Sequence, residues 1–238
     1  MLQKASILLL YGFIVLPVLV AVGLVAIIWR AVGAEGYPRR QTNRLQIALA
    51  LGAVAWLAIT LWVSASGVLR HFERRPPPML LLVATVFVLA GWLAFSWVGD
   101  LVVRHTSWVV LVGLQGFRLP LELLMHRAYV EGIMPVQMSY SGRSFDIVTG
   151  ATAIMLALAL ARFRVPRWVL AAWNVLGTLL LVNILVIAIA SMPMFHRFGM
   201  DRLNVWVADP PFVWLPAVLV LTALAGHLLM FRKLRLQP

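Results

Sequence analysis

Long apolar runs, separated by short polar segments, dominate the pattern of this chain. A helix needs about 20 apolar residues to cross the hydrocarbon core of a bilayer. Six runs approach or exceed that length, and a seventh is shorter. The pattern therefore predicts an all-α, polytopic membrane protein with about seven transmembrane helices in one domain, residues 1–238. The expected spans are 5–29, 45–69, 79–99, 107–130, 146–161, 168–192 and 212–230.

Two of these runs carry small residues at helical spacing, which allow a neighbouring helix to approach closely. Ala48 and Gly52 lie one turn apart in the second run. In the fifth run, Asp146, Gly150 and Ala153 share one helical face. Since consecutive elements tend to be neighbours, we expect the fifth helix to pack on the fourth.

Composition and charge support the membrane assignment. Hydrophobic residues make up 63% of the chain and the mean hydropathy is +0.95, far above the usage of soluble domains. The absence of cysteine excludes disulfides and thiolate chemistry. The net charge of +12 is spread over short polar segments, where cations set topology and meet lipid headgroups. No basic run is long enough to predict a nucleic-acid partner.

The distribution of cations also predicts a location. Only Lys4 and Lys233 are lysines among the 20 cations, and arginine-rich usage with abundant alanine and leucine is typical of GC-rich bacterial genomes. The first apolar run is too long for a cleaved signal peptide, so we expect a retained span. Arginine and lysine are somewhat more frequent in the segments expected on the same side of the membrane as the C-terminus. This bias predicts a cytoplasmic C-terminus in the bacterial inner membrane.

The fourth run carries a polar stripe. At about 100° per residue, five side chains fall within an arc of roughly 80° on one helical face. They are Gln115, Arg118, Glu122, His126 and Tyr129. Because a charge in the hydrocarbon costs several kcal/mol, such residues normally face a bundle interior or a wet cavity. The stripe is the candidate ligand-binding site.

Local features shape the candidate site further. Arg118 and Glu122 are spaced to pair along the helix. Pro120 removes a backbone donor and frees the carbonyl of Gly116, which favours a kink. Asp146, at the start of the fifth run, is expected at the same membrane surface as His126. The alternative is structural: polar residues inside a membrane also bind helices together.

Other kinds of site fit the sequence less well. A three-histidine zinc site is conceivable at one surface, with Asp146 or Glu122 as a further ligand, but no pair has the spacing of a helical zinc motif. Haem would need two histidines at matched depth, so we expect no metal and no cofactor. A retinal pigment is excluded because no lysine lies within a span. The histidines in question are His71, His126 and His196 for zinc, and His126 and His227 for haem.

Nucleophilic catalysis remains an alternative. Ser141 or Ser144 could form a serine–histidine–aspartate group with His126 and Asp146. No nucleophile-elbow motif accompanies these residues. The same residue types also serve as turn and cap residues.

Three short stretches in this region carry a resemblance. They are Phe117-Arg118-Leu119-Pro120 followed by Glu122, then Pro135-Val136-Gln137-Met138, and then Gly142 to Ile147 followed by Thr149-Gly150. The pattern resembles one found in uncharacterised bacterial multi-pass membrane proteins. The resemblance covers about 40 residues and implies a membrane protein, without a function to transfer.

These observations lead to three hypotheses. The first is binding or translocation of a small polar or anionic solute, or of a lipid headgroup, at the polar stripe. The second is a membrane-embedded hydrolase or transferase that acts on lipid at the external interface. The third is a non-catalytic subunit whose polar helix docks a membrane protein partner. Membrane lipid is an expected partner in each case.

Overall fold

The computed structural model describes residues 5–236, and this part of the chain is helical without strands. Lys4 lies outside the described residues. Six helical stretches are long and apolar enough to cross a membrane, so the chain is a multi-pass membrane protein. They are α1 (Ile7–Ala34), α2 (Arg39–Ala65), α3 (Pro78–Phe95), Trp108–Val130, α8 (Arg167–Ala190) and Leu215–Leu236.

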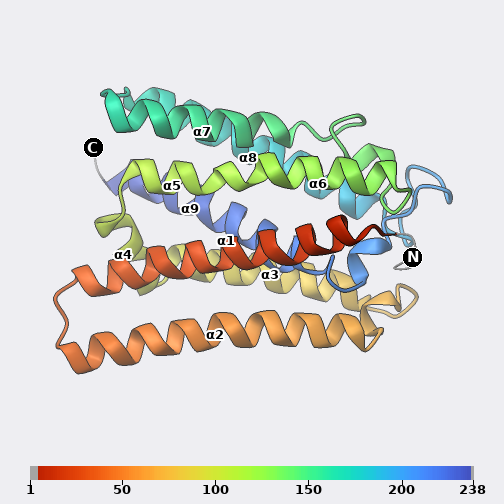
Figure 1. Ribbon diagram of the computed structural model, residues 1–238, viewed down its shortest axis with the longest axis horizontal. Helices are drawn as coiled ribbons and strands as arrows, with labels where there is room; N and C mark the ends of the chain where they lie inside the picture. The colour runs from red at the N-terminus through yellow and green to blue at the C-terminus, as the bar shows by residue number, and fades with distance from the viewer. Residues whose placement is uncertain (1–4, 237–238) are drawn as a thin grey trace.

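The expected count of seven spans is not confirmed. The run expected at 146–161 forms α7 (Asp146–Arg162), which has 17 residues. At 1.5 Å per residue it reaches roughly 25 Å, short of the ~30 Å hydrocarbon core. Its first residue, Asp146, is buried, and α7 begins partway along the bundle in Figure 1.

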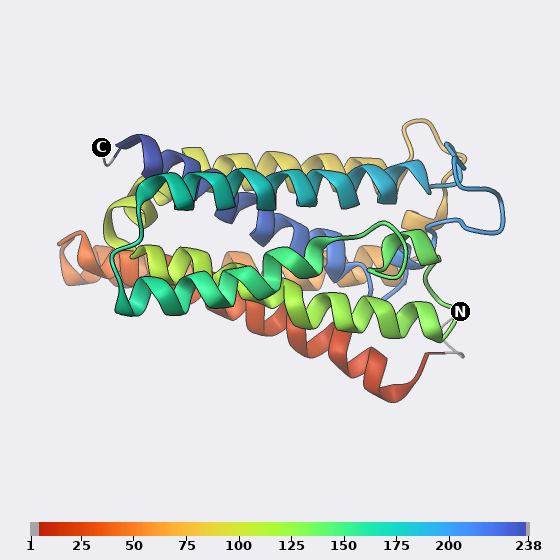
Figure 2. The ribbon, with the colours of Figure 1, turned by 90° about the horizontal axis from the view of Figure 1, so that it is seen from above.

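The helices lie side by side along the long axis of the molecule (Figure 1). The C-terminal end, the link between α1 and α2, and α4 (Trp97–His105) lie at the left-hand end. The described N-terminal end and the longer loops lie at the opposite end, which we call the loop end. Figure 2 shows α8 and α3 along one side of the bundle and α1 along the other. Helix α9 (Leu221–Leu236) crosses the middle, where it packs against α3 and α8.

The third span is shorter than the expected 79–99. Helix α3 ends at Phe95, and the chain then forms the separate helix α4 from Trp97. Gly99 explains the sharp junction, because a Cβ at this position would lie 2.2 Å from the carbonyl oxygen of Ala94. Only glycine lets the two helices join so tightly.

The fourth span agrees closely with the expected 107–130, and its interruption lies where Pro120 predicts one. It consists of α5 (Trp108–Leu114), a 3-10 turn η3 (Gln115–Phe117) and α6 (Arg118–Val130). Pro120 cannot donate to the carbonyl of Gly116, so the helix tightens in the preceding turn.

The last span starts and ends later than expected. It opens with a π-helical segment η6 (Leu215–Val220) and continues as α9 to Leu236, past the expected end at 230. Arg232 reaches the carboxylate of Asp100 on α4, and Lys233 Nζ donates to the carbonyl of Val103 at 2.6 Å. These bonds satisfy charges in the last turns, so the helix continues.

Helix α7 packs on the fourth span as predicted. The approach is so close that a Cβ on Gly150 would lie 2.2 Å from the backbone nitrogen of Leu119. The segment between α6 and α7 contains a 3-10 turn, η4 (Val136–Met138). From this turn the chain runs back along α6 before α7 begins (Figure 1). Asp146 is thereby brought beside Arg118.

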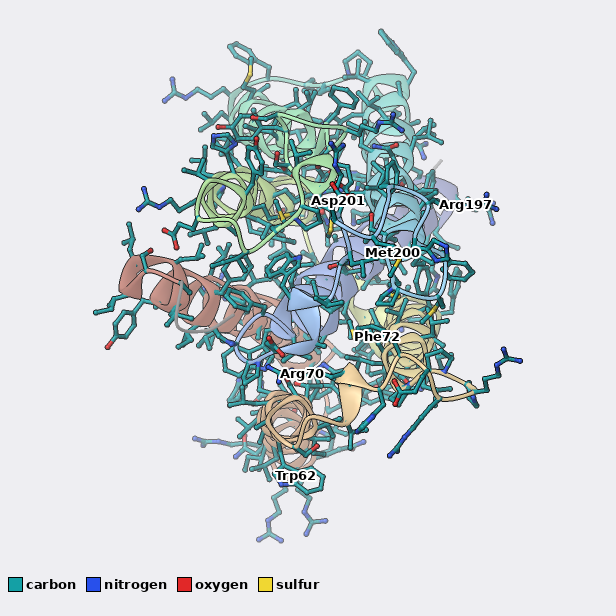
Figure 3. All side chains as sticks on the ribbon, turned by 90° about the vertical axis from the view of Figure 1, so that its right-hand side faces the viewer. Trp62, Arg70, Phe72, Arg197, Met200 and Asp201 are labelled. Atoms are coloured by element: carbon teal, nitrogen blue, oxygen red, sulfur yellow. The ribbon has the colours of Figure 1, made fainter. Side chains whose placement is uncertain are left out.

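Helix α2 lies at the edge of the bundle, and its loop end is fastened. Ser64 Oγ donates to the carbonyl of Ala208 in η5 (Trp206–Ala208) at 2.7 Å. Arg70, at the end of η2 (Val68–Arg70), pairs with Asp209 at 2.5 Å between Nε and Oδ1. This hydrogen-bonded ion pair raises the pKa of Arg70. Trp62 points away from the bundle (Figure 3).

Candidate functional site

The centre of the site is an ion pair between Arg118 and Asp146. Arg118 is 1% exposed although it lies at the middle of a membrane span. Its Nε donates to Asp146 Oδ2 at 2.6 Å, and Nη2 is in ion-pair contact with the other carboxylate oxygen, Oδ1. The bond through Nε is charge-assisted and therefore strong, whereas Nη2 and Oδ1 have no hydrogen-bond partner. The pairing expected between Arg118 and Glu122 is not formed.

His227 completes the surroundings of Arg118. Arg118 Nη1 lies 2.9 Å from His227 Nε2 and donates to the carbonyl of Gly177 at 3.3 Å. Because a guanidinium can only donate, Nε2 of the histidine must accept. The ring proton then belongs to Nδ1, which donates to Asn174 Oδ1 at 2.7 Å. The network therefore assigns His227 as the neutral Nδ1–H tautomer.

The network joins helices that are distant in sequence. Arg118 lies on α6, Asp146 on α7, Asn174 on α8 and His227 on α9. Gly177 makes the junction possible, because a Cβ there would lie 2.6 Å from the His227 ring. The site is thus an interhelical polar core, and its four members come from four different helices.

Glu122 lies one turn from Arg118 and has a different partner. Its Oε1 accepts from Ser144 Oγ at 2.7 Å, while Oε2 has no hydrogen-bond partner. The side chain is 1% exposed. An ionised carboxylate without a paired cation is very costly to bury. This arrangement therefore suits a neutral carboxylic acid at Glu122.

Gln115 is the inner end of the predicted stripe and is fully buried. Its Nε2 donates to the carbonyl of Ala223 on α9 at 3.3 Å, and Oε1 has no partner. Gly226 allows this approach, since a Cβ there would lie 2.2 Å from Gln115 Nε2. Gln115 therefore ties the 3-10 turn of the fourth span to α9.

The outer end of the stripe does not join the buried network. His126 is half-buried, and its Nδ1 lies 3.1 Å from Ser141 Oγ. Its ring stacks on Tyr140 at 4.3 Å between centroids. Tyr129 lies 5.9 Å from the same ring. These residues form a separate aromatic and polar group near the loop end.

The three histidines of the zinc alternative have separate partners. His71 Nδ1 contacts Glu73 Oε1 at 2.8 Å, and His196 Nδ1 contacts the carbonyl of Pro193 at 3.2 Å. Within residues 5–236, no three histidine, aspartate or glutamate side chains lie close enough to hold a metal ion. The segments that carry these histidines do not bring them to one point.

Glu131 fastens the loop end of α6 to the start of α1. It accepts from the backbone nitrogen of Ser6 at 2.8 Å, from Ser6 Oγ at 2.6 Å and from Arg127 Nε at 2.5 Å. Burial alone would raise the pKa of the Glu131 carboxyl. The bonds from Ser6 and Arg127 outweigh burial and hold this pKa below its ordinary value.

Sequence reasoning missed the role of His227. The sequence suggested a position near the end of the last span, toward the opposite surface from His126. Since α9 continues to Leu236, His227 lies well inside the helix and is fully buried. Asn174 also holds His227 through its backbone, because its side-chain nitrogen donates to the His227 carbonyl at 3.2 Å.

The chemistry of the site follows from its charges. The network holds one guanidinium and two carboxyl groups, with a neutral histidine beside them. Asp146 neutralises Arg118, so Glu122 has no cation of its own. A site of this kind can exchange one anion for another at Arg118, or release and take up a proton at Glu122.

Comparisons with known proteins leave the site to be interpreted from its geometry. No protein-family model matches the chain, and neither the curated proteins nor the solved structures contain a significant match.

Proposed function

We propose that this chain is a bacterial inner-membrane protein that binds or translocates a small anionic solute, or the anionic headgroup of a lipid, at Arg118. The C-terminal end is cytoplasmic in this proposal. The observation that carries it is the buried ion pair between Arg118 and Asp146 inside the bundle, in which Arg118 Nη2 has no hydrogen-bond partner. Asp146 occupies the position that a ligand carboxylate or phosphate would take.

The placement of Asp146 supports an exchange of anions. It is the first residue of α7, and a helix N-terminus favours negative charge through its free N–H groups and its dipole. An anion that displaced Asp146 would meet both this helix end and the fork of Arg118. Short helices that begin inside a membrane are a recurrent way to build a site at this depth.

The charge balance of the site gives the proposal a means of coupling anion binding to a proton. When Arg118 is bound to Asp146, a neutral Glu122 keeps the network electrically balanced. If a ligand displaced Asp146, the site would hold an additional anion beside a single guanidinium. Because Glu122 is already protonated, the displaced Asp146 would take up the proton that offsets the added charge, so anion binding is expected to strengthen as pH falls.

The segment between α6 and α7 is the expected route of access. Ser144, which closes over Glu122, belongs to this segment and is fully buried. His126 and Tyr129 lie at the outer end of the same stripe. Movement of this segment away from α6 would open a polar path from the loop end to Arg118, where the solute would bind.

The test is thermal unfolding of the detergent-purified chain with acetate, phosphate or glycerol phosphate, a water-soluble equivalent of a lipid headgroup. A ligand at 100 times its Kd stabilises the folded state by about 2.7 kcal/mol. We expect at least one of these anions to stabilise the wild type. Asp146→Asn should enlarge the shift because it frees Arg118, and Arg118→Gln should abolish it.

Arg127→Gln is the matched control, because Arg127 is an exposed arginine of the same helix with a carboxylate partner. Its anion response should equal that of the wild type. Equal stabilisation by anions in wild type, Asp146→Asn and Arg118→Gln would overturn the proposal. The polar core would then have only the structural role of holding the helices together. A chain that aggregates unless co-purified with another protein would favour the subunit hypothesis instead.

One observation favours a second candidate function, a hydrolase acting on lipid. Ser141 and His126 are in hydrogen-bonding contact near the loop end. Asp146 is held by Arg118, so it does not orient His126 as a triad acid would. Fatty-acid release from phosphatidylglycerol vesicles that is lost in a folded His126→Ala variant would support the enzyme. Equal release by the variant would exclude this dyad.

A further inference from the structure

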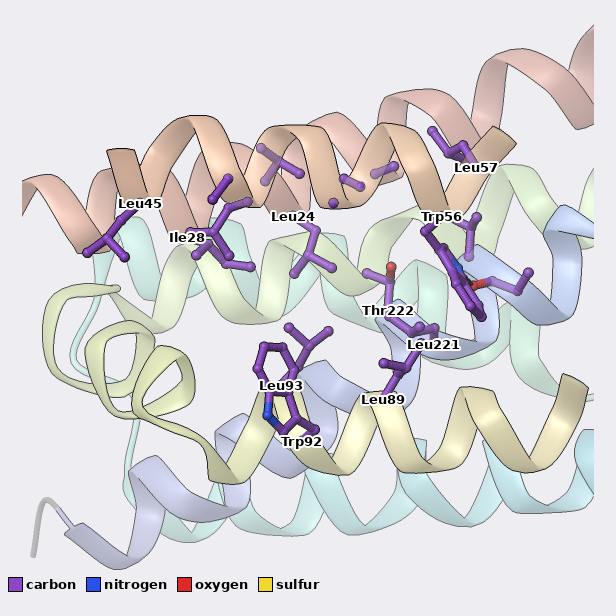
Figure 4. Close-up of a pocket in the computed structure, with 18 of the residues that line it drawn as sticks. Leu24, Ile28, Leu45, Trp56, Leu57, Leu89, Trp92, Leu93, Leu221 and Thr222 are labelled. Carbon is purple, nitrogen blue, oxygen red and sulfur yellow. Dashed lines mark hydrogen bonds between the residues drawn. The ribbon is translucent and has the colours of Figure 1, made fainter. Parts of the chain in front are cut away.

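A long apolar cleft runs along the inner face of α2, on the side of the bundle away from the Arg118 network. Its volume is about 420 Å³. Figure 4 shows it between α2 and α3, with Leu24 and Ile28 of α1 on one side and Leu221 at its inner end. Trp56 closes this end, where its indole nitrogen donates to the carbonyl of Ala217 at 2.8 Å.

The dimensions of the cleft suit a hydrocarbon chain. Along α2 its lining runs from Leu45 to Leu57, which is roughly 18 Å at 1.5 Å per residue. This length is close to the depth of one leaflet, about 15 Å, or half of the ~30 Å hydrocarbon core. The cleft is therefore long enough to hold most of one acyl chain.

The expected helix contact at Ala48 and Gly52 is replaced by this cleft. Both residues line it, and a Cβ added to Gly52 would meet no atom within 4 Å. Small side chains here therefore widen a groove. The lining is apolar except for Thr222, whose hydroxyl is buried without a partner at the inner end.

Positive charge gathers where the cleft reaches the membrane surface. Arg44 directly precedes Leu45, the outermost α2 residue of the lining, and Arg39 lies at the first position of the same helix. Both arginines are exposed, and no acidic residue lies in the first turn of α2. Glu35, nearby in the link from α1, pairs instead with Arg104 and His105. An anionic group at the mouth of the cleft would meet uncompensated cations.

We infer that this cleft binds one acyl chain of an anionic phospholipid, whose phosphate lies against Arg39 and Arg44. The apolar lining accounts for the chain and the arginines account for the headgroup. The site is independent of Arg118 and does not rest on the function proposed above. A bound lipid would fill the space between α2 and the rest of the bundle.

The test is native mass spectrometry of the full chain, purified in mild detergent and titrated with dioleoyl phosphatidylglycerol or dioleoyl phosphatidylcholine. Two arginines near a membrane surface should together favour the anionic lipid by about thirtyfold. Arg39→Gln with Arg44→Gln should remove this preference. Gly52→Leu should weaken both lipids by about tenfold or more, since its side chain would occupy the cleft.

Matched controls separate the cleft from general effects. Gly91 on α3 also has open space at its Cβ but does not line the cleft, so Gly91→Leu should bind lipid as the wild type does. Arg162, the last residue of α7, and Arg164, just after this helix, are exposed arginines away from α2. Changing both to glutamine should leave the lipid preference intact.

Three results would overturn the inference. One is equal lipid binding by Gly52→Leu and the wild type. Another is loss of binding in Thr222→Val, because an acyl chain presents no polar group to that hydroxyl. The third is a dimer in the wild type that Gly52→Leu dissociates without a change in lipid binding, which would make a second copy the occupant. Arg118→Gln should leave this lipid unaffected.

Discussion

The Arg118–Asp146 pair can be tested by removing one charge and then both. Asp146→Asn leaves the guanidinium buried at 1% exposure without a counter-charge. Loss of one partner from a buried pair costs about 3–5 kcal/mol. The remaining contacts, to the Gly177 carbonyl and to a neutral His227, carry no negative charge. We therefore expect Asp146→Asn to lower the free energy of unfolding by at least about 3 kcal/mol.

Replacing both members by apolar residues of similar size should behave differently. In Arg118→Met with Asp146→Leu no buried charge remains unpaired, and such replacements are often neutral or stabilising. We expect the double variant to recover most of the loss, to within about 1–2 kcal/mol of the wild type. The cost of the single change therefore measures the isolated charge, whereas the double change measures what the pair itself contributes.

The assay is equilibrium unfolding in mild detergent by added dodecyl sulfate, followed by the fluorescence of the ten tryptophans. Arg127→Met is the control, because its exposed pair with Glu131 should contribute only about 0–1 kcal/mol. A cost below about 1 kcal/mol for Asp146→Asn, equal to that of the control, would refute the reasoning. It would mean that water or a rearranged partner already compensates Arg118.

Three further predictions follow from the same contacts. The pKa of Glu131 is lower in the folded than in the unfolded chain, so its carboxylate stabilises the fold above about pH 4.3, and this stabilisation is lost as pH falls through the folded pKa. Glu131→Gln should therefore reduce the loss of stability in acid, measured by unfolding from pH 7 to 3. Gly150→Ala should destabilise the chain by about 1–3 kcal/mol, because its Cβ would strike the Leu119 backbone, and chemical unfolding measures this cost. His227→Phe should cost about 1–3 kcal/mol by leaving Arg118 short of an acceptor, and nitrogen NMR of the wild type should show the neutral Nδ1–H tautomer.

Part of the candidate site was visible in the sequence. The helical period placed Gln115, Arg118 and Glu122 on one face, and all three are buried. The small-residue face predicted the packing of α7, which Gly150 bears out. These features depend on residues close together in the chain or on helices joined by one short segment.

Other parts of the site were not visible. The i,i+4 rule suggested that Arg118 pairs with Glu122, yet Asp146 forms the pair. The choice was made by the depth at which α7 begins, which depends on how the 131–145 segment folds back along α6. The rule for neighbours within one helix cannot anticipate a carboxylate brought in by another helix.

The sequence by itself determined that the chain is a helical multi-pass membrane protein, because lipid demands long apolar segments whose backbone groups bond internally. Tertiary structure alone decided which helices reach Arg118, how deep His227 lies, and that Gly52 faces a cleft. Each of these depends on where helices end and how they cross. Those are set by contacts between distant residues, such as Arg232 with Asp100, and the hydrophobic pattern of one segment carries no information about them.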